Sequence, residues 1–124
     1  MKKLRLAFAL AFTVILLSAS CLAQDATVVD PKHYKVEFEN DQVRVLRITY
    51  GPMEKSVMHS HPEGVVFFLN DGDGRFTFPD GKTQDQKFKA GTVIWSPETT
   101  HQPENTGDEP FEVIQIEMKT TKTK

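Results

Sequence analysis

Short segments in which apolar and polar residues alternate are the feature that most constrains how this 124-residue chain can fold. Successive side chains of a β-strand point to opposite faces, so a repeat of two residues predicts strands with one buried face. Residues 34–39 read YKVEFE, and residues 43–50 (VRVLRITY) are rich in the β-branched and aromatic residues that favour strands. The same pattern predicts further strands over residues 56–60, 65–69, 75–78, 84–89, 92–96 and 111–118.

Turn-forming residues separate these segments. Glycine accepts positive φ angles, and Asp or Asn side chains bond to their own backbone, so clusters of these residues predict turns. Such clusters occupy residues 39–41, 70–74, 79–81, 90–91 and 106–108. No segment after residue 24 has the apolar stripe of an amphipathic helix. Eight or nine short strands at regular spacing predict an all-β domain, either a small β-sandwich or a barrel.

The first 23 residues have the pattern of a secretory signal peptide. A basic start with Lys2, Lys3 and Arg5 precedes an apolar run over residues 6–17, and small residues follow. We expect cleavage after Ala23 and export, in a Gram-negative bacterium to the periplasm. The apolar run is shorter than the roughly 20 residues of a transmembrane helix, so no transmembrane anchor is expected. The alternative is a lipoprotein anchored through Cys21.

The chain without this signal is expected to be one small acidic domain. Removing 23 of the 124 residues leaves 101, which is enough for one compact domain. The removal also takes away three basic residues and the single cysteine, leaving 12 Lys and Arg against 17 Asp and Glu, a formal charge of −5. This charge argues against nucleic acid as a partner. We divide the chain into a signal peptide (1–23), an N-terminal strand segment (24–42), a barrel (43–118) and a polar tail (119–124).

Three histidines have the spacing of a metal site built on strands. His59 and His61 are two residues apart, and His101 follows forty residues after His61. Residues i and i+2 of a strand share a face, with their Cβ atoms about 6.5 to 7 Å apart, so two imidazoles can reach one cation. A third histidine from a distant strand would complete a facial set of nitrogen ligands and leave open positions for water, dioxygen or substrate. Ordinary surface or core histidines are the alternative, and His33, which has no such partner, is expected at the surface.

Two ordered motifs make the chain resemble a small single-domain member of the cupin superfamily. The first cupin motif is matched by Gly51, His59, His61 and either Gly72 or Gly74. Its glutamate is missing, because Val65 and Val66 stand at the expected positions. The second motif is matched by Gly91, Pro97, His101 and Asn105, with Thr99 in place of a glycine. The resemblance spans residues 43–117 and implies a small double-stranded β-helix, that is, a jelly-roll or cupin barrel.

The resemblance also implies one divalent metal ion held by His59, His61 and His101. Iron, zinc, nickel, manganese, copper and cobalt are not distinguished by these ligands. Glu63 is either an additional ligand or an exposed turn residue. Asn105 either fixes the loop, as the motif asparagine does in cupins, or is a plain turn residue, and Gln115 either lines a cavity or faces solvent.

Two function classes remain open, and in both the partner is a small molecule. In the first, the protein is an oxygenase-like or Lewis-acid enzyme acting on a small organic substrate, with bound water or hydroxide as base. In the second, it is a non-catalytic module that binds a small ligand or the metal itself. A homodimer is also expected, because Tyr34, Val36 and Phe38 should form one apolar face of the first strand after the signal. The alternative is that this strand folds back onto its own barrel.

Overall fold

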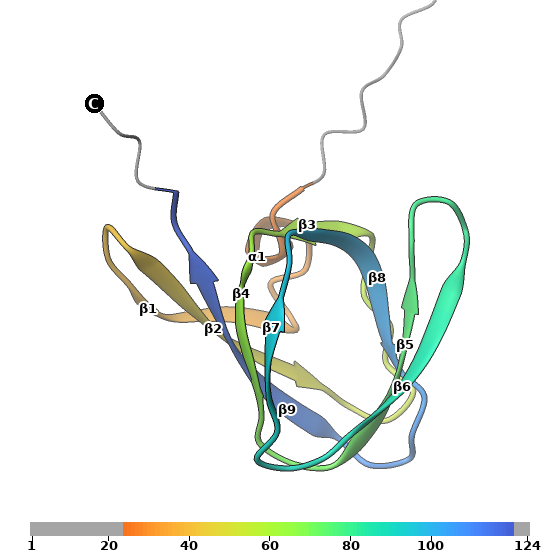
Figure 1. Ribbon diagram of the computed structural model, residues 1–124. Coiled ribbons are helices and arrows are strands. Elements are labelled where there is room, and N and C mark those ends of the chain that lie inside the picture. The colour runs from red at the N-terminus through yellow and green to blue at the C-terminus, as the bar shows by residue number, and fades with distance from the viewer. Residues whose placement is uncertain (1–23, 121–124) are drawn as a thin grey trace, which may run out of the picture.

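The computed structural model describes residues 24–120, so the predicted signal peptide (1–23) and the end of the predicted tail (121–124) lie outside the described residues. Within the described range the chain is nearly all β, as the sequence predicts (Figure 1). No helix in this range is long and apolar enough to span a membrane. The elements in chain order are α1 (Ala26–Val29), β1 (Tyr34–Glu39), β2 (Val43–Tyr50), β3 (His59–His61), β4 (Gly64–Phe68), β5 (Gly72–Thr77), β6 (Thr83–Phe88), β7 (Val93–Ser96), β8 (Thr99–Asn105) and β9 (Phe111–Met118).

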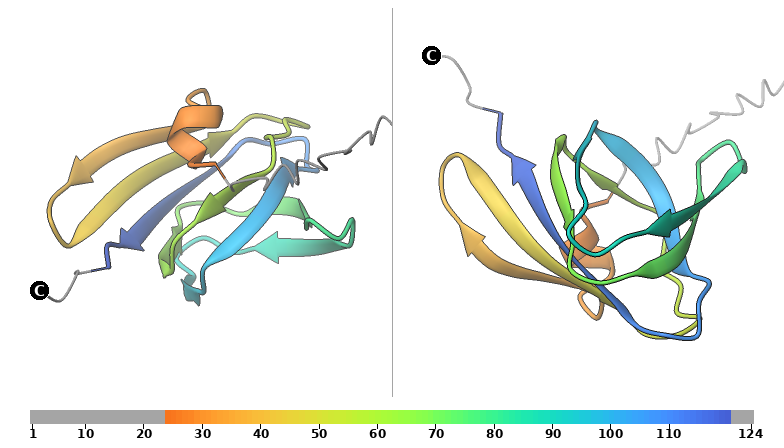
Figure 2. Two further views of the ribbon diagram at one scale, coloured as in Figure 1. Left: turned by 90° about the horizontal axis from the view of Figure 1, so that it is seen from above. Right: turned by 60° about the horizontal axis from the view of Figure 1, so that its bottom comes forward.

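The strands form two sheets in which every pair of neighbours is antiparallel. One sheet has the order β1-β2-β9-β4-β7, and the other has the order β3-β8-β5-β6. The two sheets lie as layers on either side of the interior, and α1 lies beside β1 and β3 (Figure 1, Figure 2). This architecture confirms the predicted double-stranded β-helix.

All eight predicted strands have a counterpart, but the bounds of five differ from the predicted ones, and a further strand, β8, is missed. β1, β2 and β9 begin and end at the predicted residues. β8 is missed because its polar residues and Pro103 hide the repeat of two residues. The strand predicted over residues 56–60 is observed as β3, which covers only His59–His61. The short helix α1 is also missed, because four residues capped by the side chain of Asp25 are too few to show a stripe.

Two glycines predicted to form a turn belong instead to β5, which begins at Gly72. A Cβ atom added to Gly72 would lie 2.9 Å from Cβ of Phe111, and one added to Gly74 would lie 2.7 Å from Cε2 of Phe88. Real Cβ atoms do not approach other atoms so closely. Both glycines therefore allow β5 to pack closely on the core.

The core lies between the two sheets. Phe68 of β4 stacks on Phe88 of β6 with ring centroids 4.5 Å apart, and this contact joins one sheet to the other. The other core side chains in the described range are Ala26, Tyr34, Leu46, Ile48, Tyr50, Phe111 and Val113. Along the inner face of β9, Phe111 and Val113 are followed by the buried polar residues Gln115 and Glu117. The inside of the molecule thus changes from apolar to polar along β9.

The outer face of the five-stranded sheet carries a row of apolar side chains. A register shift between Val36 and Phe38 in β1 places Phe38 opposite Val45, which is on the outer face, whereas Tyr34 points into the core. The prediction that Tyr34, Val36 and Phe38 share one face is therefore wrong. The strand pairing aligns the members of this outer row, which are Phe38, Val45, Ile116, Val65 and Trp95. The two ends of the row, Phe38 and Trp95, are 53% and 56% exposed.

Candidate metal centre

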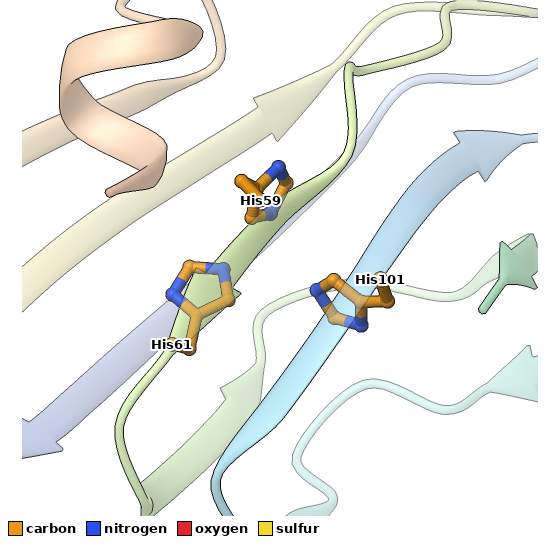
Figure 3. Close-up of side chains that lie close together, drawn as sticks. All are labelled: His59, His61 and His101. Carbon is orange, nitrogen blue, oxygen red and sulfur yellow. The ribbon is translucent and has the colours of Figure 1, made fainter. Parts of the chain in front are cut away.

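The three histidines come together because β3 and β8 are neighbours in the second sheet. The pairing places His59 directly opposite His101, and His61 shares the inner face of β3 with His59. The rings point toward one another, with centroids 4.8 Å (His59 and His61), 5.2 Å (His59 and His101) and 5.5 Å (His61 and His101) apart (Figure 3). Each residue offers one nitrogen, and these nitrogens lie within 4.8 Å of one another. The three histidines could therefore hold one metal ion.

Hydrogen bonds at Nδ1 leave the Nε2 atoms of His59 and His61 for another partner. Nδ1 of His59 is 2.8 Å from the carbonyl oxygen of Val57, and Nδ1 of His61 is 2.7 Å from Oε1 of Glu117. Nε2 of His59 and Nε2 of His101 are buried and have no hydrogen-bond partner among the described residues. A buried polar atom without a partner is costly, and it is common where a protein leaves a position for an ion. These free nitrogens fit a divalent cation.

His59 and His101 are also held in the neutral form that binds metals. Burial, together with the charge that His61 would carry, lowers the pKa of His59 to about 4. Burial is the largest cause that lowers the pKa of His101 to about 3, and the charges that His61 and His59 would carry lower it further. A metal ion must otherwise compete with protons for imidazole nitrogen. At neutral pH, no such competition occurs at these two residues.

Glu117, which the sequence analysis did not select, is the nearest carboxylate to the site. It is almost fully buried on β9, where Oε1 contacts His61 and Oε2 accepts a hydrogen bond from Nε of Arg44 at 2.7 Å. A carboxylate on the outer nitrogen of a ligand histidine fixes its tautomer and raises its basicity. The repeat of two residues from Phe111 to Glu117 is the signal that could have placed Glu117 inside.

His33 lies in the interior and not at the surface, so that prediction is wrong. It is 5% exposed and stacks on Tyr50 with ring centroids 4.4 Å apart. Its Nδ1 is 2.6 Å from Oδ2 of Asp30, and its Nε2 is 2.9 Å from Oε2 of Glu54. Asp30 is a sequence neighbour of His33, but Tyr50 and Glu54 are distant in sequence, and the local pattern around His33 does not show them.

The other candidate site residues are Glu63, Asn105 and Gln115, and none of them belongs to the three-histidine group. Glu63 is exposed and is not part of the three-histidine group. Asn105 is fully buried and ties loops together: its Nδ2 donates to the carbonyl oxygens of Gly51 and Glu109 at 2.9 and 2.8 Å, and its Oδ1 accepts from the backbone N–H of Gly107 at 2.9 Å. Gln115 is buried and lines the cavity that adjoins the histidines.

A cavity of about 350 Å³ adjoins the histidines, and His61 and His101 form part of its wall. Most of the wall is aromatic or aliphatic, including Phe68, Phe76, Phe88, Ile94, Phe111 and Val113. Its polar side chains include Gln84, Gln86, Gln115 and Glu104. Within the described residues, none of the lining residues is Lys or Arg. An ion held by the histidines would therefore be the main positive charge met by a molecule in this cavity.

Comparison with known proteins gives one family and several similar folds. The cupin domain model matches residues 46–117, more than half of the chain. A cupin domain from Bordetella pertussis Tohama I is similar over 70% of this chain and 92% of its own, with 25% identity and a TM-score of 0.66. A protein with a double-stranded β-helix domain from Klebsiella pneumoniae is similar over 67% of this chain and 72% of its own, with 22% identity and a TM-score of 0.54.

The DMSP lyase DddQ from Ruegeria pomeroyi is similar over 77% of this chain and 51% of its own, with 17% identity and a TM-score of 0.54. No curated protein matches the sequence. At such low identity, the lyase and the Klebsiella protein show likeness of fold alone. The family match covers the strands that carry all three histidines, and the two-sheet topology agrees with it. The chain therefore belongs to the cupin family.

Proposed function

We propose that the protein binds one divalent metal ion through His59, His61 and His101 and presents it to a small organic molecule in the adjoining cavity. The observation that carries this proposal is the pair of buried, unpartnered Nε2 atoms on His59 and His101. The support of His61 by Glu117 agrees with it, because the bond at Nδ1 leaves Nε2 of His61 for the ion. When bound, such an ion supplies a Lewis acid or an oxygen-activating centre.

The wall of the cavity indicates which molecules fit. Aromatic side chains favour a compact apolar molecule, and without Lys or Arg in the wall, a second negative charge would have no counter-ion. We therefore expect a ligand that is neutral or carries one negative charge on an oxygen that faces the histidines. Gln115 and the glutamines of β6 can hydrogen-bond to the rest of such a molecule.

Catalysis and simple binding are the two forms that this function can take. An oxygenase-like or Lewis-acid reaction is the first form. The second is a module that binds without turnover, and the composition of the wall favours it: the glutamines cannot transfer protons, and Glu104 is the single carboxylate among the described lining residues. Oxygen uptake by the iron-loaded protein, measured with small diketones, phenols and thiols, separates the two. Turnover of any of these identifies an enzyme, whereas a ligand-induced rise in melting temperature without turnover identifies a binding module.

Metal content tests the proposed site directly. Replacement of His59, His61 or His101 by Ala should each remove most of the bound metal, measured as the metal-to-protein ratio of the purified protein. Thr100→Ala is the matched control, because Thr100 lies next to His101 on β8 and bonds to Ser60 rather than to the histidines. Full metal content in His101→Ala would contradict the proposal.

Glu63→Gln tests whether a fourth protein ligand exists. We expect its metal affinity to stay within about twofold of the parent, because Glu63 is exposed and lies apart from the three-histidine group. A hundredfold loss, equivalent to about 2.8 kcal/mol, would make Glu63 a ligand. The two proteins are compared by metal titration at one pH.

We further propose that the protein is exported and acts in the periplasm after cleavage following Ala23, with anchoring through Cys21 as the alternative. The basic, apolar and small-residue pattern of residues 1–23 supports this. Fractionation of a Gram-negative host that expresses the full chain, with mass spectrometry of the product, tests it. A product that starts at Met1 and remains in the cytoplasmic fraction would contradict export.

A further inference from the structure

The segment before the first strand, residues 24–33, lies directly against the strand that carries two of the histidines. The backbone N–H of Ser60 donates to the carbonyl oxygen of Gln24 at 2.9 Å, and Asp25 forms a parallel bridge with Ser60. Ser60 stands between His59 and His61 on β3. The helix α1, which follows Asp25, lies beside the same strand (Figure 1). Residues 24–33 thus form a support behind the histidine strand.

The first contact from this segment reaches His61. Oδ2 of Asp25 accepts a hydrogen bond from Nη2 of Arg44 at 2.6 Å, and Nε of Arg44 donates to Oε2 of Glu117 at 2.7 Å. The other oxygen of Glu117 is the one that contacts Nδ1 of His61. Arg44 is largely buried and Glu117 almost fully so, which shields the bond between them, whereas the side chain of Asp25 is 37% exposed and its bond to Arg44 is partly screened by solvent. The orientation of His61 is therefore linked to Asp25.

The second contact reaches His59. Oδ2 of Asp30 accepts hydrogen bonds from Oγ of Ser56 at 2.5 Å and from Nδ1 of His33 at 2.6 Å. Oγ of Ser56 is in turn 3.3 Å from Nδ1 of His59. Burial alone would raise the pKa of Asp30, but the hydrogen bonds from Ser56 and His33 lower it, so the carboxylate is ionised at neutral pH. Asp30 therefore holds Ser56 in place beside His59.

We propose that residues 24–33 act as an outer clamp that orients both histidines of β3 for the metal, with Asp25 acting on His61 and Asp30 acting on His59. This proposal rests on the proposed binding of a metal by the three histidines. The clamp and Arg44 lie outside the residues matched by the cupin domain model, which begins at residue 46. Metal affinity is thus set partly by a segment that precedes the matched domain. Asp25 and Asp30 are positioning residues, because neither contacts the nitrogens that would bind the ion.

Cobalt(II) titration of the purified protein tests the clamp, because this ion reports both affinity and ligand geometry through its visible absorption. We expect Asp25→Asn and Asp30→Asn each to weaken Co²⁺ binding by roughly 3- to 10-fold and to change the absorption spectrum, less than the roughly 10- to 100-fold expected when a carboxylate bonded directly to a ligand histidine is lost. Asp85→Asn is the matched control, since Asp85 is an exposed carboxylate that bonds to Arg75 and, among the described residues, not to the histidines or to residues 24–33. It should leave both readouts unchanged.

Combined variants test the two separate contacts. Asp25→Asn should add little to Glu117→Gln, because both interrupt the same chain of bonds to His61. Asp25→Asn and Asp30→Asn should be additive, because they act on different histidines. Circular dichroism and thermal unfolding identify any variant that fails to fold. If Asp30→Asn fails to fold, Ser56→Ala takes its place in the series, because Ser56→Ala interrupts the same contact to His59.

The outcomes separate the clamp from the metal site itself. The clamp is overturned, and the metal site left intact, by one combination of results. In it, Asp25→Asn and the variant at the second contact (Asp30→Asn or Ser56→Ala) bind Co²⁺ within twofold of the parent and show the parent's spectrum, while His59→Ala does not bind Co²⁺. Unchanged binding in His59→Ala and His101→Ala would instead overturn the proposed function. Weakened binding with an altered spectrum in both clamp variants supports the proposal.

Discussion

The three histidines receive different support from their surroundings. His61 is backed by the carboxylate of Glu117 and His59 by the carbonyl oxygen of Val57, whereas the ring of His101 stacks on Phe76 with centroids 5.2 Å apart. An aromatic ring fixes orientation without supplying charge. His101 should therefore be the least basic of the three imidazoles, and its buried Nε2, like that of His59, has no partner among the described residues.

Replacing His101 by Phe should stabilise the metal-free protein while abolishing metal binding. The change removes a buried Nε2 that has no partner among the described residues, and an unpartnered buried polar atom costs about 1 to 3 kcal/mol. Urea unfolding in the presence of a chelator measures the difference. The parent protein loaded with metal should be at least as stable as the His101→Phe variant. If the variant is less stable than the metal-free parent, this account of Nε2 is contradicted.

At the scale of the elements, the sequence predicts regular strands well and irregular ones poorly. The alternation in β1, β2 and β9 follows directly from one buried face, and the two-residue spacing of His59 and His61 places them together for the same reason. β8 has no such alternation, and its structure depends on pairing with β3 and β5. Glu117 and Asp30 act through partners more than twenty residues away, which no local pattern contains.

Asn105, at the end of β8, should contribute strongly to stability and only indirectly to metal binding. Its side chain satisfies backbone groups of Gly51, Gly107 and Glu109, so Asn105→Ala should cost about 2 to 4 kcal/mol in the free energy of unfolding. Asn40→Ala is the control: its amide oxygen also accepts two backbone hydrogen bonds, but in an exposed turn, where water replaces them. Equal losses in the two variants, measured by urea unfolding, would contradict a special role for Asn105.

At the scale of the whole molecule, the outer row is an unusual surface for a single copy of this chain. It crosses all five strands of one sheet without interruption, and its ends are about half exposed. Ion pairs of Arg47 with Glu37 and Glu112 flank it on the same face. A second copy placed about a twofold axis would meet the same apolar row and charges of both signs, so we propose that the row is the contact of a homodimer.

Trp95→Glu and Phe38→Lys should each convert the proposed dimer to a monomer, because a charge at either end of the row would be buried in the contact without a partner. Sedimentation velocity measures the mass in solution. Val28→Lys is the control, since Val28 is an equally apolar and more exposed residue on α1, away from the outer row. A parent protein that sediments as a monomer, or variants that remain dimers, would exclude the outer row. Removal of the chain up to the end of β1 is a poorer test of the dimer, because it also removes residues 24–33, which contact β3.

The unpartnered nitrogens of the metal centre have a consequence for the lifetime of the protein in a cell. Any ion that binds the folded chain and not the unfolded one shifts the folding equilibrium in proportion to the logarithm of its concentration. If the three histidines bind an ion as proposed, the chain without that ion spends more time open to proteases than the chain that holds it. The amount of this protein should then follow the supply of the proposed metal, even when the rate of synthesis is constant.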